Sequence, residues 1–191
     1  EINNEMPKAN LIVDANQAYS PKKSIEFIER LEKMDINLEA FEQPVSKNNI
    51  RGLSYISNNV KTPIVADESV FTPVDAMKMI EEDAVDIVNV KLGKSGILET
   101  IDIISILRSS NMGIMMGCML ESLIGIHTSG HIVAGTDAFD LVDLDGSLRL
   151  LAEMKDYLKS PEIHIRSPGH GISVDDIIDN LQATQSLLRE K

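Results

Sequence analysis

The sequence has one cysteine, Cys118, among its 191 residues. A single cysteine cannot form a disulfide within the chain, which excludes a small fold stabilised by internal disulfides. Chains without such bonds are typical of a reducing compartment. We therefore expect a cytoplasmic protein.

Basic residues and long apolar runs are also scarce. The 18 Lys and Arg residues stand against 30 Asp and Glu residues, which gives a formal charge of −12. This balance disfavours partners such as nucleic acid or an anionic membrane surface and suits a protein that concentrates cations. No apolar segment approaches the roughly 20 residues of a membrane span, and the opening EINNEMPKAN lacks the apolar core of a signal peptide. Because the first residue is Glu1 rather than Met, we expect the natural N-terminus to lie elsewhere.

What the sequence does have is a repeated unit. Six short apolar runs each lead into a polar turn: NLIVDAN, LEAFEQP, TPIVADES, VDIVNVKLG, MGIMMGCMLES and FDLVDLDG. Helix-length amphipathic segments such as 21–34 and 73–82 lie between them. Strand alternating with helix predicts an α/β fold with parallel strands and helical crossovers.

The polar residues at the ends of these runs recur at a regular interval. From Asp14 to Glu42 is 28 residues and from Glu42 to Asp67 is 25, and the following steps of 24, 27 and 25 residues reach Lys91, Cys118 and Asp143. Each interval accommodates one strand, one helix and two loops. The carboxyl ends of parallel strands are where α/β barrels and open α/β sheets assemble their active sites. We therefore expect these side chains to converge.

The first three of the converging residues are acidic. Asp14, Glu42 and Asp67 would repel one another at one sheet edge unless a cation neutralised them. Oxygen ligands without Cys or His suit Mg²⁺ better than zinc. Each acid alone could equally be a solvated loop residue or a helix N-cap, but their common register favours a shared site. Side-chain alternation along a strand predicts that Glu68 points away from Asp67.

The ordered motifs resemble those of a known family. DAN at 14–16, EQP at 42–44, DES at 67–69 and DIVNVKLGKSGI at 86–97 are similar to the enolase superfamily, in its muconate-lactonizing subgroup. GCMLES at 117–122 and DLDG at 143–146 narrow the resemblance to dipeptide epimerases of the Ala-Glu type. The resemblance implies a partial enolase-type (β/α) barrel over 1–160, containing strands three to eight. Residues 161–191 would then return toward a capping domain that this chain lacks.

The resemblance also implies the roles of individual residues. Asp14, Glu42 and Asp67 would bind Mg²⁺, and Lys91 would be a catalytic acid/base. Removing a proton α to a carboxylate creates an unstable enediolate unless positive charge already lies at its oxygens, which Mg²⁺ would supply. Lys91 must lose its proton to act as a base, and a nearby cation would favour this by lowering its pKa. The alternatives are a surface role for Lys91 and catalysis by Lys94, which lies three residues further on in the expected loop.

The substrate residues follow from the same resemblance. Asp143 and Asp145 would hold the α-ammonium group of a dipeptide, for which two carboxylates on one strand face are suited in charge; two exposed loop acids are the alternative. Cys118 and Met119 would lie near the substrate, although the surrounding methionines fit core packing. Four further side chains are expected to be mainly structural. Ser122 would cap the following helix, and Glu121 would line the pocket or cap the same helix. His127 and His131 would lie on a helix face.

One requirement of an epimerase is missing from the sequence. Reprotonation on the opposite face of the α-carbon needs a second acid/base, which the family places in a Lys-x-Lys one strand before Asp14, ahead of Glu1. Six strand units are also too few to close an eight-stranded barrel. We expect the chain to be the carboxyl part of a longer enzyme, whose missing N-terminal part would be its partner. Whether the enzyme forms a homo-oligomer stays open at this point. The rivals are muconate cycloisomerase, o-succinylbenzoate synthase and a non-catalytic barrel fragment.

Overall fold

A computed structural model describes residue 5, residues 9–146, and residues 163 and 169. The predicted boundary at 160 and almost all of the predicted segment 161–191 lie outside this part, as do His164 and His170. Within it, every helix is too short or too polar to cross a membrane.

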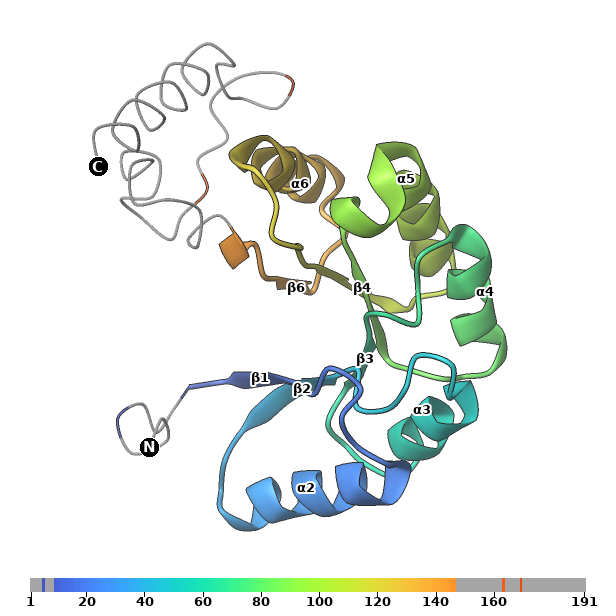
Figure 1. The fold of residues 1–191 in the computed structure, drawn as a ribbon, viewed down its shortest axis with the longest axis vertical. Coiled ribbons are helices and arrows are strands. Elements are labelled where there is room, and N and C mark those ends of the chain that lie inside the picture. The colour runs from blue at the N-terminus through green and yellow to red at the C-terminus, as the bar shows by residue number, and fades with distance from the viewer. Residues whose placement is uncertain (1–4, 6–8, 147–162, 164–168, 170–191) are drawn as a thin grey trace, which may run out of the picture. The chain divides into compact units, whose positions relative to one another are not determined.

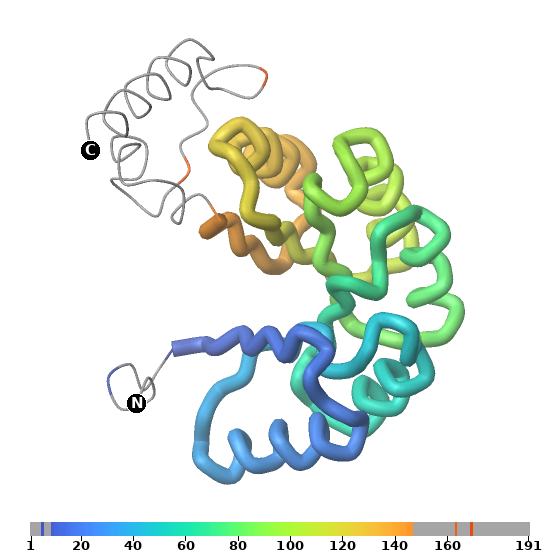
Figure 2. The backbone as a smooth tube through the Cα atoms, viewed as in Figure 1, coloured from blue at the N-terminus to red at the C-terminus, as the bar shows by residue number. Residues whose placement is uncertain are grey.

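Strands and helices alternate along the described chain, as the repeated unit predicts (Figures 1 and 2). All six strands belong to one sheet in chain order, and the pairs β1–β2, β2–β3 and β3–β4 are parallel. The elements are β1 (Leu11–Asp14), α2 (Pro21–Lys33), β2 (Leu38–Glu42), α3 (Ile50–Ser57), β3 (Ile64–Ala66), α4 (Pro73–Glu81), β4 (Ile87–Val90), α5 (Leu92–Ser109), β5 (Gly113–Met116), α6 (Leu123–Thr136) and β6 (Leu141–Val142).

The chain divides into two compact units. Unit 1 comprises Glu1–Val90 and Ser95–Met115, and unit 2 comprises Lys91–Lys94 and Met116–Lys191. In unit 1, helices α2, α3 and α4 lie along one side of strands β1 to β3 (Figure 1). The metal-ligand candidates belong to unit 1, and the other predicted site residues belong to unit 2.

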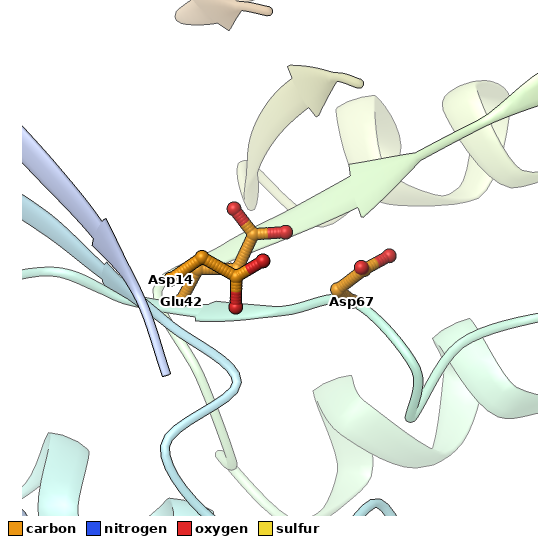
Figure 3. A group of neighbouring side chains, drawn as sticks. All are labelled: Asp14, Glu42 and Asp67. Carbon is orange, nitrogen blue, oxygen red and sulfur yellow. The ribbon is translucent and has the colours of Figure 1, made fainter. Parts of the chain in front are cut away.

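The strand register of unit 1 brings the ends of its strands level. Asp14 pairs with Glu42, and Glu42 pairs with Val65, so Asp67 lies two residues beyond that pair, directly after the end of β3. The Asp67 side chain extends on the same side of the sheet as those of Asp14 and Glu42 (Figure 3).

An aromatic cluster fixes α2 against β2 in unit 1. The ring centroids of Tyr19, Phe27 and Phe41 lie 5.3 to 5.9 Å apart, and Phe41 is fully buried. Burying a phenylalanine side chain contributes about 1.5–3 kcal/mol, and the aromatic contacts add to it. Because Phe41 precedes Glu42, this packing also fixes the end of β2.

Local sequence signals set the helix boundaries. Thr72 and Asp75 form a capping box at the start of α4, with Pro73 in its first turn, and Pro21 opens α2. Both helices begin at their predicted residues, and they end one residue earlier than predicted. The predicted loop around Lys94 is wrong: Lys94 lies in a helical turn of α5, which is interrupted only at Gly96, with φ 72°.

Candidate metal and substrate sites

Unit 1 gathers three carboxylates at the ends of neighbouring strands. We call Asp14, Glu42 and Asp67 the carboxylate triad; one oxygen of each lies within 4.8 Å of the others. The side chains extend from β1, β2 and the turn after β3 on the same side of the sheet (Figure 3). Glu42 and Asp67 are buried, and Asp14 is exposed. The predicted convergence of these three acids is confirmed as geometry.

The donor set of the triad fits a hard divalent cation. All three donors are carboxylate oxygens, which Mg²⁺ and Ca²⁺ prefer over softer ligands. Opposite oxygens around Mg²⁺ lie about 4.2 Å apart, twice the Mg–O distance, so small side-chain rotations would bring the triad to bonding range. Among the residues that the structure describes, this is the only group of three or more such side chains that meets the geometry, and the His127 and His131 pair is not part of one.

Hydrogen bonds hold each member of the triad, at its carboxylate or at its backbone. The backbone N–H of Asn16 donates to Asp14 Oδ1 at 2.8 Å, and Asn89 Nδ2 donates to Glu42 Oε1 at 2.7 Å. Asp67 is held through its own backbone N–H, which donates to the Gln43 side chain at 2.8 Å. Such outer contacts fix the direction in which a ligand presents its lone pairs.

Unit 2 carries the predicted acid/base. Lys91 directly follows β4 and is 9% exposed, unusually buried for a lysine. Its carbonyl accepts from the Lys94 N–H at 3.0 Å, which closes the first turn of α5. This burial argues against the alternative of a surface side chain, and the acid/base role itself stays a prediction.

Asp143 and Asp145, the carboxylate pair, follow the short strand β6. The Asp143 N–H donates to the Met116 carbonyl at 2.8 Å, which ties the pair to the end of β5. Partial removal from water raises the pKa of Asp143, and the charge of Asp145 raises it further, whereas the Asp145 backbone N–H and the charge of Lys91 lower it. The two acids thus interact electrostatically, and a cation bound between them would relieve their repulsion.

Cys118 and Met119 form the loop beside this pair. The Gly146 N–H donates to Cys118 Sγ at 3.3 Å, and a Cβ at Gly146 would lie 2.5 Å from the Met119 carbonyl oxygen. Burial raises the pKa of the Cys118 thiol, and the surrounding carboxylates raise it further. The thiol therefore stays protonated at neutral pH, which suits a lining role rather than a nucleophilic one.

Two neighbouring predictions are resolved by hydrogen bonds. Ser122 is the N-cap of α6 and accepts from the Gly125 N–H at 3.4 Å, as predicted. Glu121 accepts from the backbone N–H groups of Met119 at 3.0 Å and Gly93 at 3.2 Å, so it joins the turn after Lys91 to the turn after β5.

The sequence interpretation missed the part played by Gln43. Its side chain is fully buried and hydrogen-bonded to the loop that carries Asp67. The available signal was an uncharged amide placed directly after the expected ligand Glu42. Gln17, on the loop after β1, likewise bonds to the two loops that follow β2 and β3, at Lys47 and Glu68.

Comparison with known proteins is consistent with this arrangement. Among curated proteins, an L-Ala-D/L-Glu epimerase of Thermotoga maritima is 42% identical over 146 residues, which cover 76% of this chain and 42% of that protein. A hydrophobic dipeptide epimerase of Enterococcus faecalis is 38% identical over 142 residues, covering 73% of this chain and 40% of that protein. The chain thus spans less than half the length of these relatives.

A solved structure shares the fold. A dipeptide epimerase from Enterococcus faecalis, complexed with Mg and the dipeptide L-Leu-L-Tyr, superimposes with a TM-score of 0.74 at 35% identity, over 77% of this chain and 42% of that one. The prediction of a partial enolase-type (β/α) barrel is thereby confirmed. The family model described as "Enolase C-terminal domain-like" matches residues 1–178. The chain accordingly belongs to the enolase C-terminal domain-like family, and its relatives include dipeptide epimerases.

Proposed function

We propose that the chain supplies the metal site, one acid/base and the substrate ammonium site of a Mg²⁺-dependent dipeptide epimerase. The observation that carries the proposal is the carboxylate triad, in which three oxygens of successive strands lie within 4.8 Å. Support comes from relatives at 38% and 42% identity that are named dipeptide epimerases. The reaction would invert the configuration of the carbon next to the dipeptide's C-terminal carboxylate.

In this proposal the triad and Lys91 act on that carbon. Asp14, Glu42 and Asp67 hold the metal, and a bound Mg²⁺ would supply positive charge to the substrate carboxylate while the α-proton is removed. Lys91 takes or returns the α-proton through its amine. Lys91 is only 9% exposed, and burial of an amine favours the neutral form that a base requires.

The carboxylate pair positions the other end of the dipeptide. Asp143 and Asp145 accept hydrogen bonds from the substrate ammonium group, and the opposite charges make these bonds strong. Cys118 and Met119 lie beside the pair, at Gly146, and would contact the substrate without entering the chemistry. A second acid/base is needed on the opposite face of the α-carbon, and we propose that it comes from protein outside residues 1–191.

The rival reactions of the same superfamily are less well supported. Muconate cycloisomerase and o-succinylbenzoate synthase act on substrates without an ammonium group. Such substrates would bring no cation for Asp143 and Asp145 to bind. The 29% identity to the muconate lactonizing enzyme of Pseudomonas putida is also lower than the identity to the epimerases. A non-catalytic role would leave the triad able to bind metal without any proton exchange.

The test follows exchange of the α-proton in D₂O. The protein at its natural length, with Mg²⁺, is incubated with L-Ala-L-Glu and with an apolar dipeptide, and NMR measures deuterium at the α-carbon of the C-terminal residue. We expect exchange that stops on metal chelation, and a loss of about 10²- to 10⁴-fold in Lys91→Met.

The matched control is Lys94→Met, which removes the same charge three residues away and should leave the exchange rate within about threefold. Normal exchange in Lys91→Met, with loss in Lys94→Met, would transfer the acid/base role to Lys94. Metal binding without exchange of any dipeptide would favour a non-catalytic protein instead.

A further inference from the structure

We infer that Gln43 is a positioning residue of the metal site, which holds the backbone of one metal ligand from the loop of another. The inference rests on the proposed function, because it takes the carboxylate triad to be the metal site. Gln43 directly follows Glu42, and its side chain reaches the loop that starts at Asp67.

The side-chain amide of Gln43 uses its full hydrogen-bonding capacity. Oε1 accepts from the backbone N–H groups of Asp67 at 2.8 Å and Ser69 at 3.2 Å. Nε2 donates to the Val45 carbonyl at 3.0 Å and to Ser69 Oγ at 2.9 Å. Two donors and two acceptors are all that a glutamine amide offers. The group is therefore bound at both ends within a fully buried setting.

The chemistry of the partners requires an amide at this place. Backbone N–H groups can only donate, so the atom facing Asp67 must be an oxygen, and the Val45 carbonyl can only accept, so the opposite atom must carry hydrogen. A carboxylate would place an acceptor against that carbonyl, and an apolar side chain would leave two backbone N–H groups, one buried and one part-buried, without this acceptor. A glutamate, the residue at position 42, would therefore not satisfy the hydrogen-bond partners at position 43.

The backbone of Gln43 strengthens the same connection. Its φ of 33° lies in a region that residues other than glycine seldom occupy, and its N–H donates to the Val65 carbonyl at 2.8 Å. Strained backbone persists where the surrounding contacts over-determine it, and such strain clusters at functional sites. The bonds of Gln43 thus hold β2 and the Asp67 loop at one spacing.

This spacing matters for the metal because Glu42 and Asp67 would both bind it. A ligand set that is held in place before the ion arrives loses little freedom on binding, so its affinity is higher. Removing outer contacts of this kind typically lowers metal affinity by about 10- to 100-fold. Gln43 would set affinity without touching substrate, and the proton transfer itself would be unaffected once metal is bound.

The experiment measures Mn²⁺ binding by electron paramagnetic resonance, in the protein at its natural length and well below its melting temperature. We expect Gln43→Met to raise the Mn²⁺ dissociation constant about 10- to 100-fold. At saturating Mn²⁺ the α-proton exchange rate of this variant should return to within about threefold of wild type. Recovery of this kind separates positioning from general damage to the fold.

The matched control is Gln17→Met, the same chemical change in an adjoining loop. The Gln17 side chain bonds to the Lys47 N–H at 3.0 Å and to the Glu68 carboxylate at 3.0 Å, but to no backbone atom of the triad. The Gln17 backbone N–H donates to the Gln43 carbonyl at 2.8 Å, a bond that the variant would keep. The dissociation constant of Gln17→Met for Mn²⁺ should stay within about twofold of wild type.

A second variant, Ser69→Ala, removes one of the four bonds of the Gln43 amide and changes only a half-buried side chain. We expect it to raise the Mn²⁺ dissociation constant about threefold. This variant decides the question if Gln43→Met does not fold.

Each outcome separates this inference from the proposed function. Wild-type affinity in a folded Gln43→Met, or an equal loss in Gln17→Met, overturns the positioning role while the metal site stands. If Gln43→Met does not fold, wild-type affinity in Ser69→Ala overturns it. No Mn²⁺ binding by the wild-type protein overturns the metal site, and the positioning role with it. The expected affinity changes without any dipeptide exchange would support the role of Gln43 and contradict the epimerase.

Discussion

The carboxylate triad of unit 1 and the carboxylate pair of unit 2 are both clusters of like charge, but they are built differently. Two of the three triad acids are buried; Asp14 and Glu42 accept hydrogen bonds at their carboxylates, and Asp67 is held through its backbone N–H. Both acids of the pair are exposed, and one carboxyl has a raised pKa.

This difference in burial and geometry indicates which cation each cluster suits. Three carboxylate oxygens within 4.8 Å, two of them from buried side chains, match a small divalent ion that demands near-ideal geometry. Two exposed acids at a strand end match a group that is monovalent and larger, such as a substrate ammonium. We therefore expect substitutions in the two clusters to separate metal binding from substrate binding.

The largest expected effect is in the triad. Glu42→Gln should weaken Mg²⁺ binding by at least about 100-fold, because it removes a charged ligand rather than an outer contact. Asp145→Asn is the matched control, since it makes the same change of charge in the pair and should leave Mg²⁺ affinity within about twofold. Isothermal calorimetry measures both, and comparable losses would erase the distinction between the clusters.

A smaller effect is expected on the substrate. Asp143→Asn should lower kcat/KM for a dipeptide by about 10- to 100-fold, because a hydrogen bond to a charged group contributes about 1.5–3 kcal/mol. Mg²⁺ affinity should not change. Steady-state kinetics with a dipeptide and with its N-acetylated form test the ammonium role, which is contradicted if wild type turns over both equally well.

The pH dependence of dipeptide binding should reflect the raised pKa of Asp143. Substrate affinity should fall as pH drops through this pKa, because the protonated acid no longer attracts the ammonium. In Asp145→Asn the negative charge that raises the pKa of Asp143 is gone, so the loss of affinity at acidic pH should begin at a lower pH. A profile of 1/KM against pH measures the shift, and an unmoved limb in the variant would show that Asp145 does not act on Asp143.

The same pKa predicts a stability effect of definite sign. Because the pKa of Asp143 is higher in the folded protein than its ordinary value of 3.8, the fold binds more protons than the unfolded chain between these two values. Its contribution to stability therefore decreases as pH rises through this window. Thermal denaturation should show this decrease reduced in Asp143→Asn.

The smallest expected effects concern the helix caps of the two units. Thr72 forms a reciprocal capping box with Asp75, whereas Ser122 accepts a single bond at 3.4 Å. Thr72→Ala should cost about 1–2 kcal/mol of unfolding free energy, and Ser122→Ala about 0.5 kcal/mol. Chemical denaturation measures both, and a larger loss at Ser122 would reverse the order.

Much of the fold and of the triad could be predicted because the sequence repeats one strand and one helix at a nearly constant interval. Parallel strands of similar length bring residues such as Asp14 and Glu42 to one edge without any knowledge of tertiary contacts. Gln43 could not be predicted in the same way, since three of its four side-chain bonds are to backbone groups, which carry no sequence signature. The roles of Lys91 and the carboxylate pair, and the cytoplasmic location, stay predictions.

Two glycines described above are irreplaceable for opposite reasons. Gly96 has φ 72° but open space where a side chain would begin, so Gly96→Ala would report the cost of backbone conformation alone. At Gly146 a methyl group would meet a carbonyl oxygen at 2.5 Å, so Gly146→Ala would report crowding. Attempts to evolve new substrate preferences should therefore leave position 146 unvaried, because any side chain there would push apart the loop that carries Cys118 and Met119.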